Sequence, residues 1–185
     1  MTSRRMVFKK IVLVTGLFFP VHLKLVGAPR DPCEKEIENL FLRLQSKEMS
    51  ERASLFKKMI KRCGKEVLNI VEENTISRTE EKLRTAEITY RNLDAVMENL
   101  WNQTGLTHAY TIENRTNDFL KLKVTKCLYA DEMKKLDAVD IGEAFYCSYD
   151  HGFCRGLNPD IIFTRTKTLM MGNDCCDHTY ELKNN

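Results

Sequence analysis

The sequence predicts an α+β protein, in which N-terminal helices pack with a C-terminal antiparallel sheet of ββααββ order. Between residues 32 and 101, apolar side chains recur at steps of three and four, which is the period of an amphipathic helix. After Gly105 the apolar side chains alternate with polar ones, which is the period of a half-buried strand. The segments after Gly105 leave no room for the long crossovers that a parallel sheet requires, so we expect antiparallel pairing.

Three main helices are predicted in the first part of the chain. The pair Asp31-Pro32 is typical of a helix start, Ser50 is a second candidate cap, and Gly64 is a natural stop. A longer helix is predicted from about Thr79 to Trp101. The apolar residues that define the three faces are Ile37, Leu40, Phe41 and Leu44; Leu55, Met59 and Ile60; and Leu83, Ala86, Ile88, Leu93, Val96, Met97 and Leu100.

The second part of the chain is predicted to form the sheet. The expected elements are strands at 107–113 and 119–126, helices at 129–136 and 139–155, and strands at 160–168 and 176–182. Polar turn sequences separate the strands, notably 114–117 and 172–174. In the second strand Leu120, Leu122 and Val124 share one face and lysines mostly take the other, so one face of the sheet should meet the core.

Composition excludes several classes of function. Lys plus Arg is 29 and Asp plus Glu is 26, a balance of +3 that is too small and too evenly spread for a nucleic-acid-binding surface. No nucleotide-binding, zinc-protease or serine-hydrolase motif occurs, and there are 4 histidines. We therefore expect no nucleic-acid partner, no cofactor and no metal, whereas the oligomeric state stays open.

The N-terminus differs in character from the rest of the chain. Basic residues precede an apolar run at 11–21, and Val26-Gly27-Ala28 resembles a cleavage site, as in a secretory signal. The run is shorter than the roughly 20 residues of a membrane-spanning helix, and Pro20 interrupts it. We favour a cytoplasmic protein, with export or membrane association through residues 11–28 as the alternative. The expected organisation is a basic and apolar segment at 1–30 and a single domain at 31–185, with a helical part at 31–104 and the motif region at 105–185.

The 7 cysteines have no obvious pairing, because their number is odd and no C-x-x-C occurs. A disulfide framework and a structural zinc site are therefore both disfavoured, and burial as small apolar side chains is the simplest expectation. The residues that we expect only to pack are Cys33, Cys63, Cys154 and Cys175.

Polar candidates for a site gather in the last third of the chain. Cys147 and Asp150 fall near one face of an aromatic-rich helix, where they either flank a pocket or pack. Arg165 suits bidentate binding of a carboxylate, from a substrate or from a protein Asp. On the last strand Cys176 and His178 share a face, so a Cys–His pair is geometrically allowed, although a non-catalytic explanation stays open.

These residues form a recognisable set. The segments Cys127–Ala130, Cys147–Asp150, Arg165–Thr168, Gly172 and Cys176–Asp177 follow the pattern Cys-x-x-Ala, Cys-x-x-Asp, Arg-Thr-x-Thr, Gly and Cys-Asp. In this order the chain resembles the L-2-amino-thiazoline-4-carboxylic acid hydrolase family. His178 stands where the family more often has an aromatic residue, so the resemblance does not support a role for it.

The resemblance implies a hydrolase that opens a C–N bond of a small anionic cyclic amidine or isothiourea. The attacking group that this implies is the thiolate of Cys147, with Cys127 and Cys176 as the next candidates, or a water activated by a carboxylate. The carboxylate that binds the amidine would be Asp150, with Asp140 and Asp177 in reserve. The substrate anion would bind at Arg165 with Thr166 and Thr168.

A weaker likeness links the terminal hairpin to vinyl-reductase-type ligand-binding domains, which end in a Gly turn followed by Cys. Zinc-binding members have an acidic residue and a Cys where this chain has Arg165 and Thr168, which argues against a metal. This likeness implies the alternative function, a non-enzymatic sensor or binding module for a small ligand. A third interpretation is an exported or membrane-tethered interaction protein whose cysteines are structural.

Overall fold

The structure is a computed structural model in which residues 32–183 are described. The signal-like or anchoring segment predicted at residues 1–30 lies outside the described residues, and so do residues 184 and 185. No helix among residues 32–183 is long and apolar enough to span a membrane.

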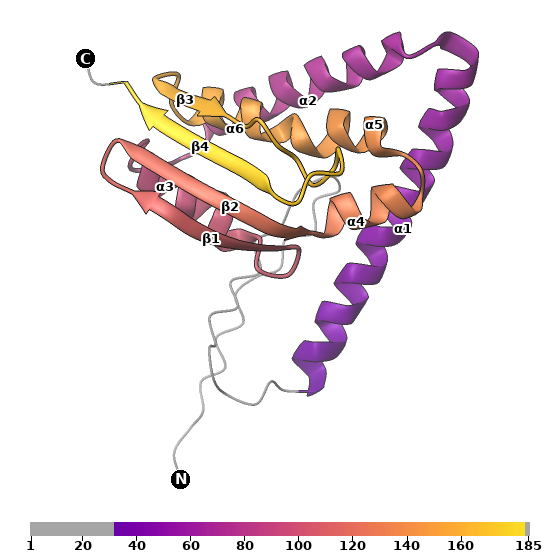
Figure 1. Ribbon diagram of the computed structural model, residues 1–185, viewed down its shortest axis with the longest axis horizontal. Helices are drawn as coiled ribbons and strands as arrows, with labels where there is room; N and C mark the ends of the chain where they lie inside the picture. Colours follow the sequence, from indigo (N-terminus) through magenta and orange to yellow (C-terminus); the bar gives the residue numbers. More distant parts are fainter. Residues whose placement is uncertain (1–31, 184–185) are drawn as a thin grey trace.

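Two long helices, α1 (Pro32–Cys63) and α2 (Glu66–Thr85), meet at a tight turn. Gly64 ends α1 as predicted, with φ of 85°, a conformation that favours glycine at a helix C-terminus. Figure 1 shows α1 crossing one side of the molecule and α2 running back behind the sheet. The predicted break at Ser50 is wrong, because a serine inside a strongly helical segment does not stop the helix without a Gly or Pro beside it.

The predicted helix from Thr79 to Trp101 is also wrong. The chain leaves α2 at Thr85 and starts again as α3 (Leu93–Asn99) and the short 3-10 turn η1 (Trp101–Gln103). The side chain of Asn92 accepts a hydrogen bond from the backbone of Ala95 at 3.2 Å and so caps α3. The apolar period of residues 79–101 therefore belongs to two helices rather than one.

The α+β class and the antiparallel sheet are confirmed. The strands are β1 (His108–Arg115), β2 (Phe119–Cys127), β3 (Ile161–Thr164) and β4 (Cys176–Leu182), in the order β1-β2-β4-β3. All neighbouring strands are antiparallel, and β2 pairs Leu122 with His178 and Val124 with Cys176 of β4. This register places His178 in the middle of the sheet, on the face that meets the core.

The predicted strand 160–168 ends at Thr164, so the threonines at 164, 166 and 168 do not line one strand face. The carboxylate of Asp177 accepts hydrogen bonds from the backbone N–H groups of Thr166 and Lys167, at 2.9 and 2.6 Å. These bonds replace ladder pairing and turn the chain away from the sheet.

The helical connection between β2 and β3 contains an irregular turn. It consists of α4 (Leu128–Lys135), α5 (Val139–Gly142), the π-helical turn η2 (Glu143–Cys147) and α6 (Tyr149–Leu157). A π-helical turn holds one more residue than an α-helical turn and re-aims the side chains that follow it. Such turns frequently lie at functional sites.

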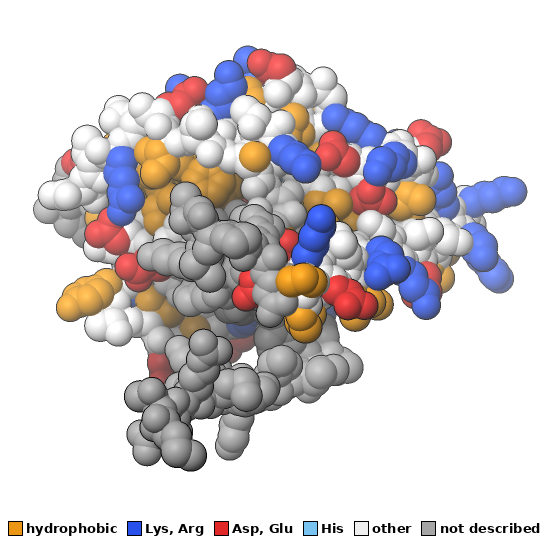
Figure 2. Space-filling model, turned by 90° about the horizontal axis from the view of Figure 1, so that it is seen from below, with side chains coloured by type: hydrophobic (Ala, Val, Ile, Leu, Met, Phe, Trp, Pro, Cys, Tyr) orange, Lys and Arg blue, Asp and Glu red, His pale blue; other side chains and the backbone are white. Residues whose placement is uncertain are grey.

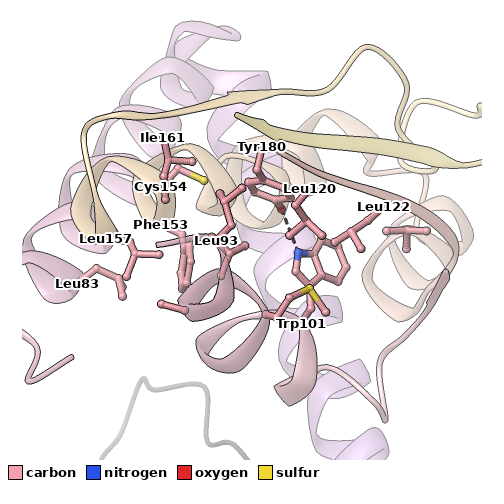
Figure 3. Close-up of a cluster of buried hydrophobic side chains, with 14 of the residues drawn as sticks. Leu83, Leu93, Trp101, Leu120, Leu122, Phe153, Cys154, Leu157, Ile161 and Tyr180 are labelled. Atoms are coloured by element: carbon pink, nitrogen blue, oxygen red, sulfur yellow. Dashed lines mark hydrogen bonds between the residues drawn. The ribbon is translucent and has the colours of Figure 1, made fainter. Parts of the chain in front are cut away.

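The helices α3 and α6 cover one face of the sheet, as Figure 1 shows. Leu120, Phe153 and Tyr180 are fully buried between these layers, and the indole Nε1 of Trp101 donates to the Tyr180 hydroxyl at 3.0 Å (Figure 3). Behind them α2 packs closely on α6, because Gly152 and Gly156 carry no side chain where α2 passes. A second cluster, with Met49 and Met133 at its centre, joins α1 to α4 and α5.

Candidate functional site

Polar side chains from four segments meet where α6 begins beside β4. Asp150 comes from the first turn of α6, Glu143 from η2, Arg165 from the loop after β3, and His178 from β4. We call these four residues the Asp150 cluster. The side chains of Arg165 and His178 are only 6% and 5% exposed. Charged groups buried to this degree need partners, and here they provide them for one another.

Asp150 is the centre of the cluster. Its Oδ2 atom accepts a hydrogen bond from Nη1 of Arg165 at 2.6 Å and lies 3.2 Å from Nε2 of His178. The second guanidinium nitrogen of Arg165 donates to the backbone carbonyl of Cys147 at 3.2 Å and lies 3.5 Å from the Glu143 carboxylate. The cluster thus joins two carboxylates, one guanidinium and one imidazole.

These contacts keep Asp150 ionised. Burial alone raises the pKa of the carboxyl, but the hydrogen bond from His178 and the charges of His178 and Arg165 outweigh it, so the pKa lies below its ordinary value. An ionised carboxylate can only accept hydrogen bonds, so the contact of 3.2 Å is a hydrogen bond when Nε2 of His178 carries the proton, and Nη1 of Arg165 lies 3.4 Å from the same nitrogen. In the neutral ring, Nδ1 then carries the lone pair and is the basic atom.

Two buried polar atoms of the cluster have no hydrogen-bond partner among residues 32–183. They are Nδ1 of His178 and Oε2 of Glu143. Most buried polar atoms in proteins are paired, and the exceptions frequently mark a place for water, an ion or a ligand. The cluster therefore presents one unpaired basic nitrogen and one unpaired carboxylate oxygen.

The three cysteines proposed as nucleophiles are held as thiols. Burial raises the pKa of Cys147 well above its ordinary value, and the opposing effect of Arg165 is smaller. Burial likewise raises the pKa of Cys127 to about 11 and also raises that of Cys176, whose sulfur accepts a hydrogen bond from the backbone of Leu169. Because the thiolate is the nucleophile, a raised pKa disfavours covalent attack from these positions.

The remaining predicted site residues lie outside the Asp150 cluster. The Thr166 hydroxyl donates to the half-buried Asp177 carboxylate at 2.5 Å, and the backbone N–H of Thr168 donates to the side chain of Asn173 at 3.0 Å. Asp140 forms an exposed ion pair with Lys65 at 2.6 Å. The structure thus brings Asp150 and Arg165 together, with Cys147 beside them, and places these other residues elsewhere.

Two open hollows lie on the surface. One, of about 240 Å³, is formed by α1 with Leu136. The other, of about 220 Å³, lies on the outer face of the sheet between Lys121, Lys167 and Asp174. Neither contains a residue of the Asp150 cluster. Within residues 32–183, no group of three or more His, Cys, Asp or Glu side chains is arranged to hold a metal ion.

The family comparison supports the motif pattern. The model of the L-2-amino-thiazoline-4-carboxylic acid hydrolase family matches residues 37–180. The chain belongs to this family. The match includes the helical half of the chain as well as the motif region, so the family extends over most of the fold. A comparison with curated protein sequences gives no significant match.

Two solved structures are similar in outline. The phenol-responsive sensory domain of the transcription activator PoxR, with phenol, is 10% identical with a TM-score of 0.44, over 72% of this chain and 74% of that chain. A trafficking protein particle complex subunit 3 from Naegleria fowleri, covalently bound to palmitic acid, is 11% identical with a TM-score of 0.47, over 77% and 97%. Likenesses this distant say nothing about the ligand of this chain.

Proposed function

We propose that the protein hydrolyses a small anionic cyclic amidine or isothiourea, opening a C–N bond of the ring. The proposal rests on family membership and on one observation, the unpaired Nδ1 of His178 in a ring whose Nε2 is held by Asp150. A buried imidazole oriented by a carboxylate is a common arrangement for a general base. The sequence motifs include Asp150, and in the structure His178 contacts this carboxylate.

The charges of the cluster suit both ends of such a substrate. Oε2 of Glu143 is an unpaired acceptor, and an amidinium group offers the N–H donors that such a carboxylate binds. The contact between Glu143 and Arg165 is long, at 3.5 Å, so it is a weak ion pair rather than a tight hydrogen bond. A substrate carboxylate can take the place of Glu143 on Arg165, which leaves Glu143 to bind the amidinium end.

The chemistry then needs one water molecule. Nδ1 of His178 accepts a proton from water as the oxygen attacks the amidine carbon, and Asp150 stabilises the imidazolium that forms. The ring C–N bond breaks, the oxygen becomes a carbonyl, and the leaving ring nitrogen takes up the two hydrogens of the water, one of them through His178. No thiolate is required, which agrees with the raised pKa of Cys147.

The test is turnover of 2-amino-thiazoline-4-carboxylate and of a panel of cyclic amidines by the purified chain, followed by mass spectrometry for the gain of one water. We expect D150N and H178N to lose at least about 100-fold in kcat, since general acid–base groups contribute about 10²–10⁴-fold. C147S should retain activity, because the water route does not use the thiol.

The matched control is D131N, which removes an exposed carboxylate on α4. It should leave both the fold and turnover unchanged. Circular dichroism of each variant separates a loss of chemistry from a loss of folding. Stoichiometric binding of the panel without any turnover would overturn the proposal and support the sensor alternative, and loss of turnover in C147S with H178N active would support a thiolate route.

A further inference from the structure

The first half of α1 carries an apolar face that no described residue covers. Ile37, Leu40 and Leu44 are 58%, 50% and 56% exposed, although large apolar side chains normally avoid this. Their spacing places them on one side of the helix. Figure 2, which shows the molecule from below relative to Figure 1, shows hydrophobic side chains at the surface among charged ones.

The exposed face is separate from the face that α1 uses within the molecule. The helix packs on α4, α5 and η2 through Met49, Ala53 and Phe56, which lie further along the chain. Lys57 adds a hydrogen bond from its Nζ atom to the carbonyl of Leu136 at 2.6 Å. Ile37, Leu40 and Leu44 point away from this packed face, because the two groups differ by roughly half a turn of a helix with 3.6 residues per turn.

We propose that this face binds the same face of a second copy of the chain, with the two α1 helices antiparallel and the twofold axis beside Leu40. In this arrangement Leu40 meets the partner's Leu40, and Ile37 meets the partner's Leu44. A twofold interface of this kind is self-complementary, so one exposed stripe is sufficient to build it.

The charges beside the stripe select the second copy and its direction. Glu36 precedes the stripe, and the cations Arg43 and Lys47 follow on the same flank, where all three are exposed. In the antiparallel pair each Glu36 lies between the partner's Arg43 and the partner's Lys47, and the pairing occurs twice by symmetry. In a parallel twofold pair this flank would face the partner's opposite flank, so Glu36 would meet neither the partner's Arg43 nor the partner's Lys47.

The partner helix would lie against the half of α1 that does not pack on the body of its own protomer. The two helices overlap through their first halves only, whereas the body of each protomer is attached to the second half of its own α1. The contact is small, since three apolar residues from each chain form its centre. Interfaces well below about 1,200 Å² are weak, and we expect a Kd on the order of 10 μM.

The test is the mass of the full chain in solution as a function of concentration, measured by analytical ultracentrifugation with reductant present. We expect a reversible monomer–dimer equilibrium that L40E weakens at least about 100-fold, because it buries two like charges. I70E is the matched control, since Ile70 is a 66% exposed residue on α2, and it should leave the equilibrium unchanged.

A charge exchange tests the direction of the helices. E36R alone and R43E alone should each weaken the dimer about tenfold, since each substitution replaces an attractive pair with a repulsive one at two symmetry-related places. The triple variant E36R/R43E/K47E, which reverses the sign of all three charges, should recover most of the affinity. A chain that stays monomeric at every concentration would overturn the proposal. This outcome would include the case that residues 1–31 cover Ile37, Leu40 and Leu44. A dimer that L40E does not change would also overturn it.

Discussion

The balance of charge around Asp150 depends on single side chains. Asp150 receives a short hydrogen bond from Arg165, and the same guanidinium reaches the carbonyl of Cys147 and the carboxylate of Glu143. Removing one partner of a buried charged pair costs about 3–5 kcal/mol, because the other charge is then left unpaired. The residues that we assign to chemistry therefore also stabilise this end of α6, which is why tests of activity need a measurement of folding beside them.

His108 gives the sharpest prediction for a single residue. Burial lowers its pKa from 6.5 to about 4, an effect that the Asp150 charge opposes in part. In the unfolded chain the imidazole binds a proton near pH 6.5, whereas the native imidazole does not do so until about pH 4. Stability should therefore be complete above pH 6.5 and fall on acidification toward pH 4, by up to about 3 kcal/mol.

The measurement is urea unfolding at intervals between pH 4 and 7. H108N removes the titrating group and should flatten the pH dependence in this interval. H151N is the comparison, because burial also lowers the pKa of His151, but this side chain is only half-buried, so H151N should flatten the curve less than H108N does. An unchanged slope in H108N would show that other groups cause the acid sensitivity.

At the scale of elements, Arg91 joins two helix ends that the sequence does not connect. Its Nη1 atom donates to the carbonyls of Gly156 and Leu157 at the end of α6, both at 2.9 Å. Its Nη2 atom donates to the carbonyls of Leu83 and Ala86 at the end of α2, at 3.1 and 3.0 Å. One guanidinium thus satisfies carbonyl groups that a helix end leaves without partners.

Replacement of Arg91 should destabilise the fold without changing the contacts of the Asp150 cluster. We expect R91M to lower the free energy of unfolding by about 3 kcal/mol, since it leaves several partly buried carbonyls unpaired. R91K should recover only part of this loss, because an ammonium group cannot reach both helix ends. R84M is the control, since Arg84 is exposed and pairs only with Glu81 along the surface of α2. Chemical denaturation measures all three variants, and an R91M value equal to that of R84M would contradict the assignment.

This contact also explains where prediction from sequence stops. The hairpin of β1 and β2 is predictable, because the alternation and the turn residues are local signals. The end of α2 is not, because the apolar period continues through it and the break is stabilised by the distant residues Gly156 and Leu157. Ser50 fails in the opposite way, since a capping residue does not end a helix when helix-forming residues continue on both sides of it and no Gly or Pro follows.

The candidate site likewise contains residues that the sequence could predict and residues that it could not. The pairing of Arg165 with a protein Asp was one of two partners that the sequence allowed, and the structure shows that the protein Asp is Asp150. Glu143 had no sequence signal, because it reaches Arg165 through the π-helical turn η2, which no residue pattern announces. The roles of Thr166, Asp177 and Asp140 were implied by the family resemblance, whereas in the structure Thr166 bonds to Asp177 and Asp140 pairs with Lys65.

At the scale of the whole molecule, the cysteines separate into exposed, half-buried and buried groups. Cys33 and Cys63 are exposed at the two ends of α1, so the prediction that they only pack is wrong for this pair. Cys154 and Cys176 are buried in the core between the sheet and its helices, and no disulfide forms among the seven. The first half of α1 does not pack against the core, so Cys33 at its start is exposed. Cys63 is exposed because it is the last residue of α1, beside Gly64.

Thiol labelling should therefore report global unfolding. With a colorimetric disulfide reagent at pH 8, we expect the exposed Cys33 and Cys63 to react at once and the buried Cys154 and Cys176 only as the fold opens. Their slow rate should follow the unfolding equilibrium and rise in R91M by about 10²-fold, since 1.4 kcal/mol is a factor of ten and the loss is about 3 kcal/mol. C63S should remove half of the fast phase and leave the slow phase unchanged. Equally fast labelling of Cys154 in the native chain would contradict this prediction, since it would mean that the reagent reaches the core without global unfolding.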